Sequence, residues 1–377
     1  MNARLQAWYR RWGFRGILAA VVIVVLVTVS LKDGVRQPGS ANLHVHQANA
    51  FLHSRLDIPA CKDYVHDLAE FEGRQYCVFP PFPAALLMPL VAVFGMEHTN
   101  VVLLCLALSI LNIAVLWRIL EQLQVDRNLR SWLLAAFFLG TAYWLCLAQS
   151  AEIYFYAHVT AVTCILLATH EALGRGRAWL VGFCLGAALL SRQLSLYSAC
   201  FLCAALWTNP TKATWQRRFL DLAVFGVCFG ACIGVYCLFN LVRFGNMLDT
   251  GYQYMPLQSF LAARVEKYGV FNLAYVPFNF IHMFVQGFHV SFAGREQLLP
   301  QLDRFGTALT MASPFVFLAF WARGPRLLLA AAWTSVAFTL VHLLFYYNNG
   351  FVQFNAQRFT LDFMPILILL VALSNSF

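Results

Sequence analysis

Long apolar runs separated by short basic clusters dominate this chain. Apolar residues make up 60% of its 377 residues and charged residues only 11%, whereas a soluble domain carries about 25% charged residues. A soluble fold has no interior large enough for this excess, so we predict an all-α polytopic membrane protein and exclude a secreted, disordered or cytosolic one. The net charge of +9 resides in the clusters, which is typical of topology signals and not of a nucleic-acid surface.

Ten of the apolar runs are candidate membrane spans. An uncharged run at 16–31 follows four arginines and indicates an uncleaved N-terminal anchor. A further run at 82–96 is short and contains two prolines, which favours an interfacial helix over a span. We therefore predict a helical bundle of about ten spans. The other nine runs lie at 101–120, 132–148, 156–173, 178–191, 194–208, 219–242, 306–322, 327–347 and 363–375.

The charges of the connecting loops support this topology. If 82–96 does not cross, four short loops face the cytoplasm and each of them is basic, as the positive-inside rule requires. Both termini are then cytoplasmic, and the chain is a single multi-pass domain, 1–377, of the cell (inner) membrane. Its outer face carries two long loops, 32–100 and 243–305, and the first of them holds interfacial helices.

The first outer loop concentrates ionisable residues. It holds seven of the 17 acidic residues and five of the 10 histidines, and a structureless loop of this length is uncommon unless it has a function. In a strand, His44 and His46 would lie on the same face and could bind one metal ion. The pattern at 41–56 instead predicts a helix, in which the two side chains point in different directions. Cys61 and Cys77 lie where disulfides can form, and their pairing stays open.

Ionisable residues at the ends of spans are the next signal, because burying them is costly. Glu152 lies in a short outer turn, and His158 follows within the next span. Arg192 ends the fifth span on the outer side, where a lipid phosphate or a role as interfacial anchor would explain it. Arg358 and Asp362 are spaced for an i,i+4 ion pair.

In their order, these features resemble the GT-C-type integral-membrane glycosyltransferases, which include lipid A aminoarabinose transferases and protein O-mannosyltransferases. Each motif alone is weak, but together they run through nearly the whole chain. They are the N-terminal anchor, an amphipathic segment at 49–56, Gly-Arg-x-Tyr at 73–76, Phe-Pro-Pro-Phe-Pro at 79–83, Phe-Gly at 94–95, Asn-x-x-Arg-Phe-Gly at 240–245, Thr-Gly-Tyr at 250–252 and Gln-Arg-Phe at 357–359.

The resemblance implies transfer of a hexosyl or pentosyl group from a polyprenyl-phosphate donor to a glycan, lipid or protein acceptor at the outer face. A phosphate leaves without a general acid, so one carboxylate and one cation near the phosphate suffice. The membrane lipid is the further partner. The resemblance assigns no definite cofactor and leaves a divalent cation open, and no metal ligand is assigned. The resemblance matches Glu152 to the second acid of the family and Arg192 to its phosphate-facing residue. With Asp67, chosen for its setting next to His66 and before the turn at 73–83, the candidate catalytic residues are Asp67 and Glu152. The candidate substrate-binding residues are Arg192, His158, Tyr252 and Arg358.

One departure from the family keeps other functions open. The first-loop acid of the family usually follows the first span directly, but 39–49 contains no acid. Asp33 lies earlier and Asp67 later than expected. A transporter or flippase of lipid-linked sugars and a non-catalytic scaffold with the same fold therefore remain as alternatives.

Overall fold

A computed structural model of the chain describes residues 35–59, 67–211, 214–257, 259–288, 290–302, 306–348 and 356–374. The predicted anchor at 16–31, Asp33 and Cys61 lie outside these residues. The anchor and the pairing of Cys61 with Cys77 therefore stay predictions.

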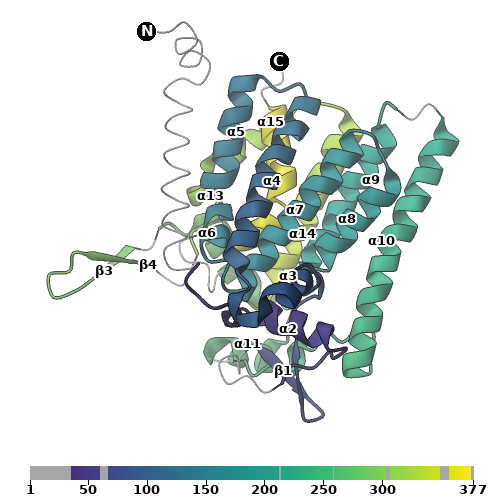
Figure 1. Cartoon of the computed structure of the whole chain (residues 1–377). Coiled ribbons are helices and arrows are strands. Elements are labelled where there is room, and N and C mark those ends of the chain that lie inside the picture. The colour runs from purple at the N-terminus through teal and green to yellow at the C-terminus, as the bar shows by residue number, and fades with distance from the viewer. Residues whose placement is uncertain are drawn as a thin grey trace, which may run out of the picture.

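Helices make up most of the described chain (Figure 1). Four of the described helices are long and apolar enough to cross a membrane: α4 (Val101–Gln122), α7 (Ile153–Leu173), α10 (Trp215–Phe244) and α14 (Arg326–Phe345). Shorter apolar helices accompany them, namely α3 (Phe82–His98), α8 (Ala178–Leu189), α9 (Ser198–Thr208) and α15 (Met364–Leu373). The prediction of an all-α polytopic membrane bundle is confirmed.

Two predicted spans are not continuous helices. The run at 132–148 divides into α5 (Arg127–Leu139) and α6 (Tyr143–Ala148), because the hydroxyl of Thr141 accepts a hydrogen bond from the Tyr143 amide. The run at 306–322 divides into α13 (Leu309–Ala312) and the 3₁₀ helix η7 (Pro314–Trp321), because a residue before proline avoids the helical region.

The two interruptions contact each other. Ser313 lies at the second break with φ −137° and ψ 61°, and its hydroxyl donates a 2.6 Å hydrogen bond to the carbonyl of Gly140 at the first. This bond satisfies a backbone carbonyl that the broken helix leaves open.

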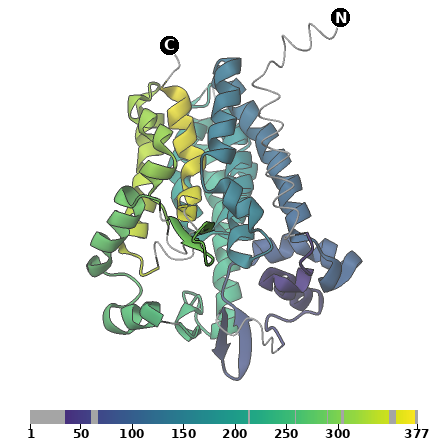
Figure 2. The same cartoon turned by 90° about the vertical axis from the view of Figure 1, so that its left-hand side faces the viewer.

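Helix α7 lies inside the bundle, between α4 and α8, whereas α10 stands at the edge and packs on α8 (Figures 1 and 2). The contact between α8 and α10 is close because α8 presents Gly182 and Gly186. A Cβ at Gly182 would lie 2.7 Å from the carbonyl of Phe225, and one at Gly186 would lie 2.3 Å from the sulfur of Cys232. Small residues commonly permit such approach between membrane helices.

One end of the bundle, which we call the α2–α3 end, carries the short elements of the first long loop (Figure 1). Helix α2 (Leu43–Leu52) is capped by Asn42, whose side chain accepts a hydrogen bond from the His44 amide. The helix ends before residue 56, where the sequence predicted its end. Strands β1 (Leu68–Phe71) and β2 (Arg74–Cys77) form a hairpin. Both turn residues of that hairpin have positive φ, as a two-residue hairpin turn favours.

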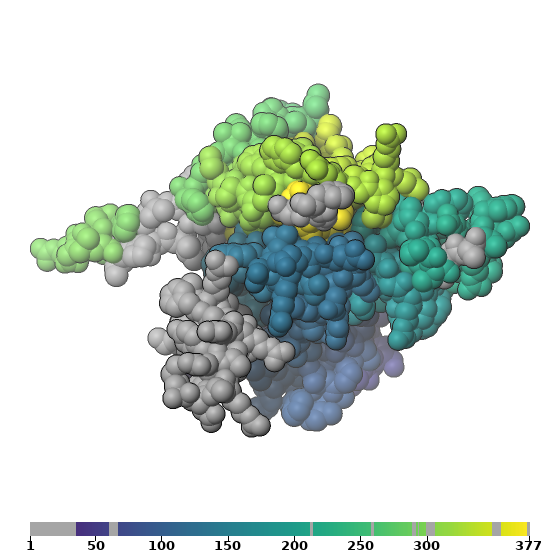
Figure 3. Space-filling model, turned by 90° about the horizontal axis from the view of Figure 1, so that it is seen from above, coloured from purple at the N-terminus to yellow at the C-terminus, as the bar shows by residue number. Residues whose placement is uncertain are grey.

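The second long loop contributes the remaining small elements. They are η4 (Tyr252–Tyr254), α11 (Ser259–Tyr268), η5 (Leu273–Tyr275), α12 (Val276–Phe280), the π-helical turn η6 (Ile281–Val285), and strands β3 (Val290–Ala293) and β4 (Leu299–Leu302). The β3–β4 hairpin reaches out on the side opposite α10 (Figure 3). Membrane orientation of the two long loops stays a prediction.

Candidate functional site

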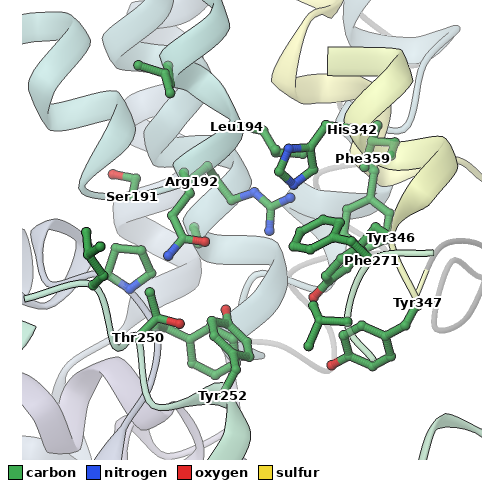
Figure 4. A pocket seen from close by; sticks show the side chains of 18 of the residues that line it. Ser191, Arg192, Leu194, Thr250, Tyr252, Phe271, His342, Tyr346, Tyr347 and Phe359 are labelled. Atoms are coloured by element: carbon green, nitrogen blue, oxygen red, sulfur yellow. The ribbon is translucent and has the colours of Figure 1, made fainter. Parts of the chain in front are cut away.

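A cavity of about 680 Å³ opens at the α2–α3 end, between the short helix η3 (Gln193–Tyr197), the end of α14 and the loop after α10. Most of the large side chains on its wall are aromatic (Figure 4). These are Phe79, Tyr154, Tyr197, Tyr252, Phe271, Tyr346, Tyr347 and Phe359. Arg192 and Asp249 are the charged side chains among its described lining residues.

Arg192 projects its guanidinium into this cavity (Figure 4). It lies where α8 has ended, with extended backbone before η3. Its Nε donates to Oδ1 of Asp362 at 3.1 Å and its Nη2 donates to Oδ2 at 2.8 Å. Asp362 is buried, in the 3₁₀ helix η8 (Arg358–Asp362), so a buried carboxylate holds Arg192 through a two-bond, fork-like pair.

The ion pair expected from sequence was Asp362 with Arg358, four residues away. The carboxylate of Asp362 instead pairs with Arg192, which is 170 residues distant. The buried guanidinium of Arg358 lies 5.2 Å from the ring centre of Tyr154 and 4.8 Å from that of Phe359. Arg358 is therefore stacked behind two rings of the cavity wall.

His158 lies behind the same carboxylate. Its Nδ1 is 3.8 Å from Oδ1 of Asp362, and its ring faces Phe359 with centres 6.2 Å apart. His158 is fully buried, and neither ring nitrogen has a hydrogen-bond partner among the described residues. His158 does not line the cavity. It could therefore affect a bound ligand only indirectly, through its contacts with Asp362 and Phe359.

Asp67 and Glu152 both lie near the start of α7. The hydroxyl of Tyr154, which lies on the cavity wall, donates a hydrogen bond to Asp67. Glu152 is the N-cap residue of α7 and its side chain is exposed. Partial removal from water raises the pKa of the Glu152 carboxyl. The positive charge of Arg358 opposes this increase, and the negative charge of Asp67 adds to it. Neither carboxylate is itself a lining residue.

Tyr252 lies directly on the cavity wall. Gly251 precedes it with φ +83°, and a Cβ there would lie 2.3 Å from the Phe244 ring, so this turn needs glycine. Sequence reasoning missed Asp249 nearby, although it directly precedes the Thr-Gly-Tyr motif. Its Oδ1 accepts from the Gly251 amide at 2.8 Å and its Oδ2 from the Tyr254 hydroxyl at 2.9 Å.

Tyr197 and His342 are two further wall residues that the sequence did not single out. The hydroxyl of Tyr197 lies 3.0 Å from Nδ1 of His342, and both residues line the cavity. His342 lies near the end of the apolar helix α14. A histidine within a predicted span was the available signal, because such residues are rare and commonly functional.

The two histidines of α2 have separate partners. Nδ1 of His44 is 3.0 Å from the side-chain oxygen of Gln47, and Nε2 of His46 is 2.9 Å from the carbonyl of Ser40. Burial lowers the pKa of His44 to about 4. Among the described residues, no group of three or more His, Cys, Asp or Glu side chains is placed to hold a metal ion.

The fold of this chain is similar to that of a solved membrane-protein structure. No protein-family model and no curated protein matches the chain. The structure of ArnT from Cupriavidus metallidurans bound to undecaprenyl phosphate is similar, with a TM-score of 0.51 and 15% identity, over 95% of this chain and 59% of that one. ArnT from the same organism in the apo state gives a TM-score of 0.48 and 14% identity, over 99% and 60% of the two chains.

This chain therefore spans about three fifths of the length of the ArnT chains it matches. At 15% identity the likeness concerns the fold. The fold implied by the sequence resemblance to GT-C-type membrane glycosyltransferases is confirmed.

Proposed function

We propose that the chain is a membrane glycosyltransferase. It would move a sugar from a polyprenyl-phosphate donor to a hydroxyl of an acceptor, at the outer face of the inner cell membrane. The observation that carries this proposal is the cavity at the α2–α3 end, where the Arg192 guanidinium enters an otherwise largely aromatic wall. The fold likeness to ArnT, which was crystallised with undecaprenyl phosphate, supports a lipid phosphate as part of the donor.

Arg192 would bind the donor phosphate. Arginine presents five N–H donors in a rigid fork, and Asp362 occupies only Nε and one hydrogen of Nη2. Positive charge at the phosphate stabilises the negative charge that develops as the sugar leaves. The rings on the wall offer apolar faces against which a sugar can pack, which is the usual make-up of a small-molecule site.

Asp67 would serve as the general base. In the transfer step, the acceptor oxygen forms a bond to the anomeric carbon while the bond from that carbon to the phosphate oxygen breaks, through an oxocarbenium-like transition state. The acceptor proton would be relayed: the Tyr154 hydroxyl on the cavity wall takes it and passes its own proton to Asp67, to which it donates a hydrogen bond. The products are the glycosylated acceptor and the free lipid phosphate.

Other proposed roles follow from position. Glu152 would orient the acceptor, since it is exposed beside Asp67 at the same helix start. Tyr252 would contact substrate directly. His158 and Arg358 would act from behind the wall, through Asp362 and through the rings of Tyr154 and Phe359.

A transfer assay in lipid nanodiscs tests the proposal. Undecaprenyl-phosphate sugars, each radiolabelled in the sugar, are incubated with membrane glycan, lipid and protein acceptors, with Mg²⁺ or with a chelator. We expect the label to move to one acceptor fraction and free undecaprenyl phosphate to be released. Movement of intact donor between leaflets of proteoliposomes would instead identify a flippase. Binding of donor with neither event would identify a scaffold.

A further inference from the structure

The pair between Arg192 and Asp362 has an arrangement that a simple interfacial anchor does not need. Asp362 is 1% exposed, and burying a carboxylate is costly unless it is paired and hydrogen-bonded. Among the described residues, Arg192 is the only hydrogen-bond donor to that carboxylate. The bundle thus holds a negative charge directly behind the cation that would bind a phosphate.

The stereochemistry of the guanidinium shows what this charge achieves. Asp362 engages the edge formed by Nε and Nη2. The other parallel edge, formed by Nη1 and the second hydrogen of Nη2, remains, and Nη1 makes no hydrogen bond with the described part of the chain. An edge with two parallel N–H groups matches two oxygens of a phosphate.

The pair lies at the wall of the cavity, where Arg192 is a lining residue. Figure 4 shows the Arg192 side chain entering the cavity on the side of His342 and Phe359. The Phe359 ring lies 5.4 Å from the guanidinium carbon, which limits tilting of the guanidinium plane, and Asp362 limits its rotation. Nδ1 of His158 lies 3.8 Å from Oδ1 of Asp362. The carboxylate therefore has Arg192 and His158 as neighbours, which restrict its movement.

We propose that Asp362 is a positioning residue, which holds Arg192 by one edge so that its other edge is presented to the donor phosphate. This inference rests on the proposed function, because it requires a phosphate at Arg192. It assigns to Asp362 a part in donor recognition without contact with the donor.

Two simpler roles for Asp362 predict different outcomes. If Asp362 acted only through its charge, Asp362→Asn would tighten phosphate binding, because a negative charge near the phosphate repels it. If Asp362 served only folding, Asp362→Asn would lower the yield of folded protein and leave the Kd of that protein unchanged. The positioning role predicts a higher Kd in the folded fraction, by roughly tenfold or more, as for other residues that orient a binding group.

The experiment measures the Kd of undecaprenyl phosphate in nanodiscs for folded fractions of the wild type, Asp362→Asn, Arg192→Gln and the double variant. We expect both single variants to bind more weakly, and the double variant to bind no more weakly than Arg192→Gln, because Asp362 acts only through Arg192. Asp221→Asn is the matched control: Asp221 is a buried carboxylate, paired with Arg217 at 3.4 Å in α10, and it is not among the cavity residues. Its Kd should equal that of the wild type.

The outcomes separate the two proposals. An unchanged Kd for Arg192→Gln would overturn phosphate binding at Arg192, and with it the proposed donor site. Weaker binding by Arg192→Gln with unchanged or tighter binding by Asp362→Asn would overturn only the positioning role. If Asp362→Asn does not fold, Asp362→Glu replaces it. That variant keeps the charge but shifts the carboxylate by one methylene, so we expect weaker binding, and a wild-type Kd would overturn the inference.

Discussion

Helices α7 and α10 are both long and apolar enough to cross a membrane, but their surroundings are opposite. Within the most apolar stretch of α7, 83% of residues are buried in the protein, against 17% for α10 (Figures 1 and 2). The start of α7 carries Glu152 and Tyr154, and its interior carries His158. Helix α10 instead exposes apolar side chains such as Val227 and Val235. Both helices are long and apolar enough to span a membrane, so their burial is what separates the two roles. One buried ionisable residue of α7, His158, lies within its interior, whereas Asp221 and Arg243 of α10 lie towards its ends.

The difference implies that changes around α7 should affect activity and stability more than matched changes on α10.

The largest expected effect is on catalysis, at Asp67, which accepts a hydrogen bond from Tyr154. We expect Asp67→Asn to lower the rate of transfer about 10²–10⁴-fold with donor binding retained, because the acceptor loses its general base. Single-turnover transfer with saturating donor measures this. Glu70→Gln, an exposed carboxylate in the same hairpin, is the control and should be near wild type. Near-normal turnover by Asp67→Asn would make Asp67 a simple loop acid.

A pH dependence at His44 is the next effect in size. His44 packs edge-on against Tyr156 of α7, with ring centres 5.7 Å apart, and burial lowers its pKa from 6.5 to about 4. The unfolded chain therefore binds the extra proton first, so stability is full above pH 6.5 and is lost as the pH falls toward 4. The shift corresponds to about 3 kcal/mol.

Thermal unfolding between pH 7 and pH 4 measures this loss. His44→Gln should flatten the pH dependence, because it removes the titrating group. His53→Gln, at the exposed end of α2, should leave the dependence unchanged. A wild-type slope in His44→Gln would show that another group titrates.

Overpacking gives a direct comparison of the two helices. Val162 of α7 is 1% exposed and Val235 of α10 is 55% exposed. We expect Val162→Phe to lower the free energy of unfolding by about 1–3 kcal/mol, because a packed interior does not accept the larger ring. Val235→Phe should change it by less than about 0.5 kcal/mol. Equal melting temperatures for the two variants would contradict the buried position of α7.

Loss of a helix cap should give the smallest effect. Asn42 caps α2 and also donates to the carbonyl of Ala151 at 2.9 Å, next to the start of α7. Thr214 caps α10 alone. We expect Asn42→Ala to cost about 1–2 kcal/mol and Thr214→Ala about 0.5–1 kcal/mol. Hydrogen exchange should show faster opening of the turn before α7 only in Asn42→Ala. Wild-type protection of that turn in Asn42→Ala would show that the hydrogen bond from Asn42 to Ala151 does not stabilise it.

Hydropathy predicted the long apolar helices correctly, because it depends on local composition. The topology inferred from loop charge stays a prediction. The bounds of α4, α10 and α14 fall within a few residues of the apolar runs. The breaks at Gly140 and Ser313 were not foreseen, although Thr141 and Pro314 mark them locally. The hydrogen bond that joins the two breaks links distant segments, and no local pattern indicates it.

The candidate site was predicted in part, for the same reason. Arg192 and Tyr252 line one cavity, and each had stood out locally. The partner of Asp362 was wrong, because spacing along the chain indicates only a neighbour four residues away, and the actual partner is 170 residues distant. Asp249 was missed, although it directly precedes the Thr-Gly-Tyr motif, because its hydrogen bonds to Gly251 and Tyr254 appear only in the folded turn.

A structure of the protein in nanodiscs with undecaprenyl phosphate would test the central claim most directly. The account predicts the phosphate within hydrogen-bond distance of Nη1 of Arg192, with the Arg192–Asp362 pair intact and the lipid chain leaving past Leu194 and Leu196 of the cavity wall. Lipid phosphate bound elsewhere, with the cavity at the α2–α3 end empty, would contradict it.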